Sequence, residues 1–521
     1  MYILPLILLF VICISILIDY LSIKIKKNAF QIVEDMGIGW NLANSFDCAN
    51  IEIKTMTNPD QQLTLFGNEV PTKQIFTSIK KYGFKTVRIP ITWTHFMDES
   101  GTVNPVWMNR VKEVVNWVLK AKLYCIINID KDGSLGFWLS QGLNSKDKFI
   151  YLWTQIAKEF KNYNEYLIFE SMNQVEYKIG DNYDYITLLN LNQAFVDTVR
   201  NTGGKNAERL LIVVGMNGDP NFTCAPLYKI PIDPSKKLAI SCFFFEPGRF
   251  TIETYDNPWT YYDADGKIQI SPSINKWGTE YQYKELYVFF QNFKDMFIDK
   301  GYPVIISQIG VITEDKKEIN SIREYLYSVF SVAKSFYGIM PCLFDTSDKK
   351  YGPLNYYDRV NDKWYDEVIR DNFIKISKGD FLKFTDFSYY SNKDTVNNIN
   401  ENGYLAIKIG KKKIKKIIFN VRISISNIYV NFGFLTNNKK GFYFTEQVDG
   451  FLGKKNFDGS YTYTVDVSKK DYNDYIEVQK WWNKEYSTFN YLTIEYENEY
   501  TFLNYTEFKR VYNNLYSLSE K

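Results

Sequence analysis

Short apolar runs alternate with longer amphipathic stretches from about residue 36 to residue 377. The stretches between the runs repeat their apolar positions at helical spacing. The eight apolar runs are residues 37–42, 84–89, 123–129, 166–169, 210–214, 238–245, 304–307 and 338–344. This alternation predicts an α/β fold, a closed parallel TIM (β/α)8 barrel. A doubly wound open sheet is the alternative, but no glycine-rich phosphate loop follows the first run.

Two amphipathic stretches carry clear helix signals. Asn104 is suited to cap a helix that starts at Pro105, because asparagine accepts a backbone hydrogen bond there and proline fits the first helical position. One face of that helix carries Trp107, Val111, Val114, Val118 and Leu119. The other helix presents Leu188, Leu191, Phe195 and Val199, and it stops at Gly203-Gly204.

The pattern changes after about residue 376, where helical spacing gives way to the alternation typical of strands. Turn residues such as Asn437-Asn438 and Asp458-Gly459 separate the runs. The runs are residues 381–390, 404–409, 417–430, 441–448, 460–467, 476–481 and 491–496. Short strands at this spacing predict an all-β sandwich. We therefore expect a barrel at 31–377 and a β-sandwich accessory domain at 378–521, with carbohydrate binding as one role open to it.

The N-terminal segment is a candidate for export. Residues 1–18 are almost wholly apolar, and Asp19, Lys24, Lys26 and Lys27 follow them. This pattern predicts a signal peptide over residues 1–27. An uncleaved membrane anchor is the alternative, for which the apolar run is at the lower limit of length. Either one places the protein in the secretory pathway, outside the cell or at its surface.

Composition limits the remaining function classes. The 521 residues carry a net charge of +2, which gives no sign of a nucleic-acid partner. His95 is the single histidine, which argues against histidine metal sites and catalytic triads, and we expect no cofactor. The cysteines show no CxxC spacing, so a disulfide scaffold is not expected, although one or two isolated bridges stay open. Aromatic residues make up 17% of the chain, which suits sugar stacking or reflects a codon bias.

Four motifs fall at the ends of the predicted strands. They are GWNLAN at 39–44, GFKTVRIPITW at 83–93, LIFESMNQ at 167–174 and PVIISQIG at 303–310. Together they resemble the strand-end motifs of glycoside hydrolase family 5, the endoglucanase-type cellulases, over about residues 31 to 375. The resemblance implies a barrel that cleaves β-1,4-glucans with retention, using two carboxyls about 5–5.5 Å apart.

Both implied catalytic positions hold an amide. The resemblance places the acid/base at Gln174 and the nucleophile at Gln308. A glutamine amide has no proton to give to a leaving oxygen, and it has no anionic oxygen for attack. Loss of the general acid alone removes a factor of roughly 10²–10⁴. We therefore predict a cellulase-like pseudoenzyme.

The positions around the two glutamines depart from the family as well. The motif N-x-H-H-D is Asn128 to Asp132 here, with Asp130-Lys131 in place of both histidines. The motif V-H-x-Y is Cys242 to Phe245, which loses the histidine and the tyrosine hydroxyl. Phe344 stands where the family has a tryptophan. Only Arg88 and Asn173 keep the family's usual site residues, which favours natural drift over two isolated substitutions.

The remaining cleft can still bind. Gln174, Gln308, Arg88, Asn41 and Asn173 offer hydrogen bonds to sugar hydroxyls, and we predict β-glucan or a related polysaccharide as the ligand. The predicted apolar faces are Trp40, Trp138, Phe243, Phe245 and Phe344. The alternative is a packed cleft without sugar affinity, in a structural protein or one that contacts extracellular protein partners.

A second alternative is an active hydrolase with relocated carboxylates. The strand-end acids of the barrel are Asp130, Asp132, Glu170, Glu176, Glu246 and Asp345. Glu176 with Glu246 is one conceivable pair, whereas Glu170 suits a structural hydrogen-bonding role. His95 lines the cleft or is structural. No metal is expected, and a membrane enters only through an uncleaved N-terminal segment.

Overall fold

The computed structural model describes most of residues 27–381 and nine strands beyond them. The described ranges are 27–133, 136–174, 182–225, 227–254, 259–262, 268–271, 273–278, 280–313, 316–347, 353–381, 404–408, 414–423, 431–437, 442–448, 454–455, 460–466, 475–481, 487–496 and 500–504. Residues 1–26 of the predicted export segment lie outside them. Within these ranges no helix has the length and apolarity to cross a membrane. The chain divides into two compact units, Met1–Trp259 with Ser271–Phe381, and Thr260–Ile270 with Leu382–Lys521.

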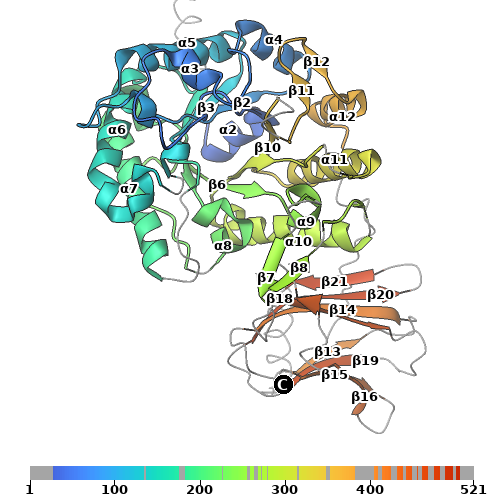
Figure 1. Cartoon of the computed structure of the whole chain (residues 1–521). Coiled ribbons are helices and arrows are strands. Elements are labelled where there is room, and N and C mark those ends of the chain that lie inside the picture. The colour runs from blue at the N-terminus through green and yellow to red at the C-terminus, as the bar shows by residue number, and fades with distance from the viewer. Residues whose placement is uncertain are drawn as a thin grey trace, which may run out of the picture. The chain divides into compact units, whose positions relative to one another are not determined.

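The first unit contains a closed barrel of parallel strands, which confirms the predicted fold (Figure 1). Its strands are β1 (Gly39–Leu42), β2 (Thr86–Ile89), β3 (Tyr124–Ile127), β4 (Leu167–Glu170), β5 (Leu211–Val214), β6 (Leu238–Phe244), β9 (Val304–Ile309) and β10 (Ile339–Asp345). They close in the order β1-β10-β9-β6-β5-β4-β3-β2. Each strand overlaps one of the apolar runs, because a parallel strand buried on both faces reads as a continuous apolar stretch.

Helices follow the strands along the chain. The α-helices of this unit are α2 (Ala29–Met36), α3 (Pro59–Leu63), α4 (Lys73–Lys81), α5 (Pro105–Lys120), α6 (Lys146–Glu159), α7 (Asn182–Asn201), α8 (Pro220–Thr223), α9 (Gly248–Thr251), α10 (Glu280–Met296), α11 (Ile319–Ser335) and α12 (Glu367–Ser377). The predicted signals of α5 are confirmed, since the Asn104 side chain accepts from the Val106 amide and Pro105 opens the helix. Its buried face differs from the predicted one, because Met108 and Val115 are buried as well and Leu119 is only partly so.

Helix α2 closes the barrel at the amino ends of the strands. Asn28 and Gln31 form a capping box that starts the helix. Ile32, Val33 and Met36 then join one buried cluster with side chains from six barrel strands. An apolar plug at this end leaves the carboxyl ends of the strands as the end where polar side chains gather.

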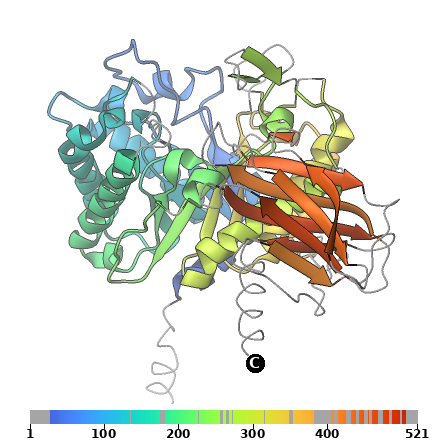
Figure 2. The ribbon, with the colours of Figure 1, turned by 90° about the horizontal axis from the view of Figure 1, so that it is seen from below.

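The described part of the C-terminal region consists of antiparallel strands. One sheet has the order β13-β19-β15-β16, and the other has the order β17-β18-β14-β20-β21 (orange to red in Figure 2). Their bounds are β13 (Tyr404–Lys408), β14 (Ile414–Ile423), β15 (Asn431–Asn437), β16 (Phe442–Val448), β17 (Lys454–Lys455), β18 (Ser460–Asp466), β19 (Tyr475–Trp481), β20 (Ser487–Tyr496) and β21 (Tyr500–Asn504). A separate hairpin pairs β7 (Trp259–Tyr262) with β8 (Ile268–Ser271). The predicted strand at 381–390 lies outside the described residues except for Phe381, and the sandwich stays a prediction.

The described cysteines are all free thiols. They are Cys48, Cys125, Cys224, Cys242 and Cys342. The isolated bridges left open by the sequence therefore do not form among them. Burial raises the pKa of each thiol, so none has the lowered pKa of a reactive cysteine.

Candidate active site

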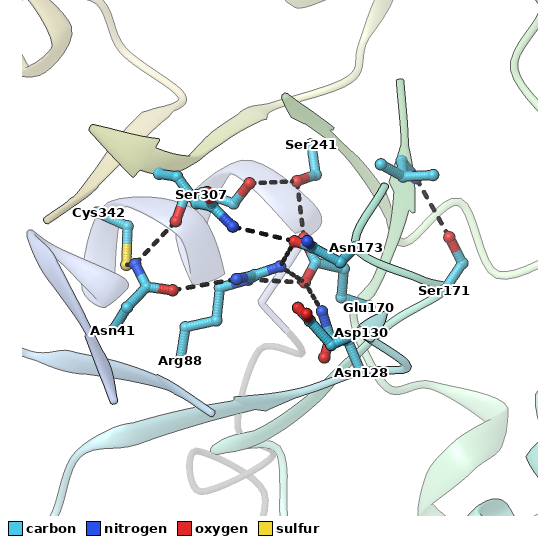
Figure 3. Close-up of polar contacts among 12 residues, drawn as sticks. Asn41, Arg88, Asn128, Asp130, Glu170, Ser171, Asn173, Ser241, Ser307 and Cys342 are labelled. Carbon is cyan, nitrogen blue, oxygen red and sulfur yellow. Dashed lines mark hydrogen bonds and ion pairs between the residues drawn. The ribbon is translucent and has the colours of Figure 1, made fainter. Parts of the chain in front are cut away.

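Arg88 lies at the centre of a buried polar network at the carboxyl ends of the strands (Figure 3). It projects from β2, and each of its three guanidinium nitrogens donates to another residue. Nε donates to Glu170 over 2.7 Å and Nη1 to Asn41 over 3.0 Å, while Nη2 donates to Asn173 over 2.7 Å. Nη2 also lies 2.7 Å from Glu170 Oε2 in an ion pair. The predicted binding residue Arg88 is fully buried, so its contacts are with the protein and not with a sugar.

Glu170 accepts hydrogen bonds at both carboxylate oxygens. Asn128 Nδ2 donates to Oε2 over 2.9 Å, and Ser241 Oγ donates to Oε1 over 2.7 Å. The Ser241 hydroxyl also lies 2.9 Å from that of Ser307. A buried carboxylate with this many partners is stabilised where it is, which confirms the predicted structural role of Glu170.

Two predicted binding residues on β1 do not reach the surface of the mouth. Asn41 is fully buried, and its amide donates to the carbonyl oxygens of Ser307 and Leu343 over 2.9 and 3.0 Å. Trp40 is also fully buried and donates from Nε1 to Asp345 over 2.8 Å. Successive side chains of a strand face opposite sides, so with Asn41 in the barrel interior Trp40 packs outside it.

Gln308 is tied to the same network. It lies on β9, and its Nε2 donates to Asn173 Oδ1 over 3.1 Å. Both residues are 7% exposed, so a small part of each amide remains open. The same Asn173 oxygen accepts from Arg88, which also donates to Asn41, so the structure brings together four of the predicted site residues.

Gln174 follows β4 and is half-buried. Its side chain has no hydrogen-bond partner among the described residues. Residues 175–181 after it, including the candidate carboxylate Glu176, lie outside the described ranges. Glu246, the other member of that conceivable pair, is half-buried just after β6.

Three phenylalanines occupy the β6 and β10 ends, and each is half-buried. Phe243 and Phe245 face the same side of β6, and their rings meet edge to face with centroids 6.4 Å apart. Phe243 is also the register partner of Gln308 on the neighbouring strand. Phe344 on β10 is the register partner of Asn41. The mouth therefore combines neutral amides with exposed aromatic edges.

Trp138 is held by the β3 loop. It opens the 3-10 helix η3 (Trp138–Ser145), and its Nε1 donates to Asp132 over 3.0 Å. Asp132 is fully buried and also accepts from the amides of Trp93 and Thr94 over 2.9 and 3.0 Å. Lys148 Nζ lies 5.0 Å from the centre of the Trp138 ring. The half-buried ring thus has a fixed orientation, with a cation over its face.

Asp130 is a buried strand-end carboxyl with one oxygen that accepts no hydrogen bond from the described residues. The residue is 2% exposed, and the oxygen is Oδ1. Lys131 Nζ lies 3.7 Å from that oxygen. Burial raises the pKa of Asp130 to about 7, although the Lys131 ammonium opposes the shift. A carboxyl with this pKa carries a proton over part of the neutral range. The sequence places Asp130 among the strand-end acids of the relocated-carboxylate alternative, but it gives no sign of this shift.

His95 is structural. It is fully buried, and its Nε2 accepts from the Asn50 amide over 3.2 Å, while the Met56 amide donates to its carbonyl oxygen over 2.8 Å. Burial lowers the pKa of His95, so the ring is neutral at pH 7. His95 therefore stabilises residues 50–56, through its ring at Asn50 and its carbonyl oxygen at Met56. Its side chain does not line the cleft.

No group of three or more ligating His, Cys, Asp or Glu side chains is close enough to hold a metal ion anywhere in the described part of the chain. The donors at the mouth are amides and hydroxyls instead. The sequence reading missed two members of the network, Ser241 and Ser307. A signal existed, because each is a polar residue inside an otherwise apolar barrel strand.

Comparisons with known proteins agree with this architecture. The model for cellulases of glycosyl hydrolase family 5 matches residues 45–350. Endoglucanase A of Paenibacillus barcinonensis is 32% identical over 64% of this chain and 86% of its own length. Endoglucanase A of Clostridium longisporum is 30% identical over 67% of this chain. The matched region covers 66% of that relative's own length.

Solved structures give the same result. A GH5-4 broad specificity endoglucanase from an uncultured bovine rumen ciliate is 52% identical, with a TM-score of 0.66 over 68% of this chain and 99% of that one. A glycoside hydrolase 5 lichenase from Caldicellulosiruptor sp. F32 was solved as a Glu→Gln mutant with cellotetraose. It is 31% identical, with a TM-score of 0.60 over 67% of this chain and 96% of that one.

Proposed function

The chain belongs to glycosyl hydrolase family 5, and on this premise we propose that it is a cellulase-like barrel that binds β-glucan without hydrolysing it. One observation carries the proposal. The amide of Gln308 stands at the implied nucleophile position and hydrogen-bonds to Asn173, and a second amide, Gln174, stands at the implied acid/base position. Neither side chain can supply the carboxyl chemistry of a retaining glycosidase.

The remaining groups suit a neutral polysaccharide. The amides of Asn173 and Gln308 are each 7% exposed and offer hydrogen bonds, while Phe243, Phe245 and Phe344 offer partly exposed rings. A few convergent polar groups among apolar side chains are typical of a small-ligand site. The complex of a Glu→Gln lichenase mutant with cellotetraose supports the idea that an amide and a bound glucan are compatible in this family.

Binding is tested by calorimetric titration of the full chain with cellotetraose. We expect saturable binding in the micromolar to millimolar range. Phe344→Ala is the companion variant, because it shortens a half-buried mouth side chain that has no hydrogen bond to lose. A weaker affinity in this variant supports binding at the mouth. No heat of binding from the unmodified protein would favour a structural or protein-contacting role without sugar affinity.

Hydrolysis is tested by reducing-sugar release from β-glucan, with an active family-5 endoglucanase run in parallel. We expect no turnover above the uncatalysed rate. Sustained release that survives repeated purification would contradict the proposal. It would then favour the relocated-carboxylate alternative.

Asp130 is the described residue that favours that second candidate. Its pKa of about 7 and unpartnered oxygen are properties of a general acid. If the chain hydrolyses glucan, Asp130→Asn should abolish the activity and leave cellotetraose affinity within about threefold of the unmodified value. Unchanged turnover in that variant would exclude Asp130 as the acid.

We also propose that the protein is exported and that residues 378–521 form a β-sandwich accessory domain. The apolar run at 1–18 and the antiparallel sheets after residue 404 support these two ideas. N-terminal sequencing of the mature protein tests the first, since a mature chain that retains residue 1 contradicts cleavage. Retention on insoluble cellulose after the barrel mouth has been saturated with cellotetraose tests a separate sugar site in the accessory domain.

A further inference from the structure

The atoms at the centre of the mouth can be identified from the hydrogen bonds alone. Arg88 Nη2 lies 2.7 Å from the Asn173 side chain, and a guanidinium only donates. The Asn173 atom in this contact must therefore be its oxygen. Gln308 contacts the same oxygen over 3.1 Å, so the Gln308 atom must be a donor, the amide nitrogen. The order of donors and acceptors around Asn173 is thus fixed by the chemistry of its partners.

An ionised carboxylate does not fit this position. Its oxygen would face the Asn173 oxygen at about the same distance, with no proton between them. The three guanidinium nitrogens of Arg88 already donate to Glu170, Asn41 and Asn173. Phe245 stands at the position where the family has a tyrosine, and it has no hydroxyl to offer. The charged residues of the network that Asn173 connects to Gln308 are Arg88 and Glu170, and they are paired with each other.

The outward halves of the two amides remain available. Asn173 Nδ2 and Gln308 Oε1 have no hydrogen-bond partner among the described residues. They are also absent from the fully enclosed unpartnered atoms, so they contact solvent at the mouth. One is a donor and the other an acceptor, and they belong to two side chains that the Gln308–Asn173 bond joins. A sugar hydroxyl both accepts and donates one hydrogen bond, which matches such a pair.

We propose that Gln308 is a positioning residue for glucan binding, whose amide locks Asn173 so that the two residues present a neutral donor–acceptor pair to a sugar hydroxyl. The proposal rests on the proposed glucan-binding function and deepens it. Position 308 is then adapted to an amide, and the glutamine is more than a disabled nucleophile. A carboxylate there must turn Asn173 away from Arg88 or take up a proton.

The test is calorimetric titration of cellotetraose into Gln308→Glu and the unmodified protein, at about pH 5 and about pH 8. At pH 8 the variant should bind about tenfold more weakly, because the Asn173 donor is lost to the sugar or a charge is buried without a partner. At pH 5 the introduced carboxyl carries a proton and donates to Asn173, so the deficit should shrink to about threefold or less. Taking the ratio of variant to unmodified affinity at each pH cancels the titration of Asp130 and His95.

Two further variants separate this role from a general effect. Gln74→Glu makes the same change of charge on the exposed surface of α4, and it should bind like the unmodified protein at both pH values. Gln308→Met removes the donor without adding charge, and it should weaken binding about threefold with no dependence on pH. If Gln308→Glu does not fold at pH 8, the methionine variant still tests the donor.

The outcomes distinguish a failure of the positioning role of Gln308 from a failure of glucan binding itself. Equal cellotetraose affinity of Gln308→Glu, Gln308→Met and the unmodified protein would overturn the positioning role and leave glucan binding in place. A pH-independent loss in Gln308→Glu equal to that of Gln308→Met would also overturn it. Absence of binding by the unmodified protein would overturn glucan binding itself and, with it, the role of Gln308.

Discussion

Two sets of residues meet at the carboxyl end of the barrel, and they differ in the polar and ionisable side chains that they carry. The buried network, which comprises Asn41, Arg88, Asn128, Glu170, Asn173, Ser241 and Ser307, is polar and hydrogen-bonded throughout. The mouth positions, which comprise Gln174, Gln308, Phe243, Phe245 and Phe344, carry no ionisable side chain. The two positions that the family resemblance assigns to catalytic carboxyls, Gln174 and Gln308, both belong to the mouth positions and hold amides.

The difference has a physical cause. Members of the buried network satisfy one another, so the loss of any one leaves a buried donor or acceptor without a partner. That penalty is felt by the fold whether or not the protein is an enzyme. A side chain at the mouth has solvent or ligand on one side, and its replacement leaves the rest of the barrel satisfied. If the chain binds glucan without hydrolysing it, as proposed, the mouth positions can change while the network is kept.

The most direct way to break the comparison is Arg88→Met. It leaves Glu170 charged, buried and without its ion-pair partner, so we expect the free energy of unfolding to fall by about 3–5 kcal/mol. Denaturant unfolding followed by circular dichroism measures this change. Arg370→Met on α12 is the control, because its partners Glu367 and Asp371 are exposed and the loss should stay within about 1 kcal/mol. Similar losses in both variants would mean that the network does not stabilise the fold.

The converse change restores carboxyls at the mouth. The double variant Gln174→Glu/Gln308→Glu should still release reducing sugar from β-glucan at least about 100-fold more slowly than an active family-5 endoglucanase. A carboxylate at 308 has no tyrosine hydroxyl beside it, since Phe245 offers none. Adding Phe245→Tyr should raise the rate. If the double variant releases sugar as fast as the active enzyme, the two amides alone account for the missing activity.

The sequence predicted the barrel because each parallel strand reads as one apolar run, and the eight barrel strands overlap the eight predicted runs. It also identified the strand-end motifs, since these are local. The motifs do not say which side of a strand each residue faces. Trp40 and Asn41 were therefore both expected at the mouth, although successive residues of a strand face opposite sides and both side chains are buried. The sequence prediction missed Ser241 and Ser307 because their role depends on contacts with Glu170 and with each other, across residues far apart in the chain.

Asp130 extends the comparison between the network and the mouth. It is buried like the network residues, but its Oδ1 accepts no hydrogen bond from the described residues. Its pKa of about 7 lies above the usual value of about 3.9, so the folded state holds the proton more tightly. Stability should therefore fall as the pH rises through about 4 to 7. Asp130→Asn should raise the unfolding free energy by about 2 kcal/mol near pH 8 and change it little near pH 4. Denaturant titrations at the two pH values measure this, and a gain of equal size at both would contradict the assigned cause.

The smallest expected effect concerns His95, which accepts hydrogen bonds from the amides of Asn50 and Met56. Its side chain forms no ion pair with the described residues. Because burial lowers its pKa in the folded state, the unfolded chain binds the extra proton more readily below about pH 6.5. The stability that this neutral ring provides is therefore present above that pH and is lost as the pH falls through the folded-state value. Asp130 acts in the opposite direction over an overlapping range, so the measurement belongs in the Asp130→Asn background. There, His95→Gln keeps an acceptor for the Asn50 amide and should flatten the decline between about pH 6.5 and 5, whereas an unchanged slope would assign the acid sensitivity to carboxylates instead.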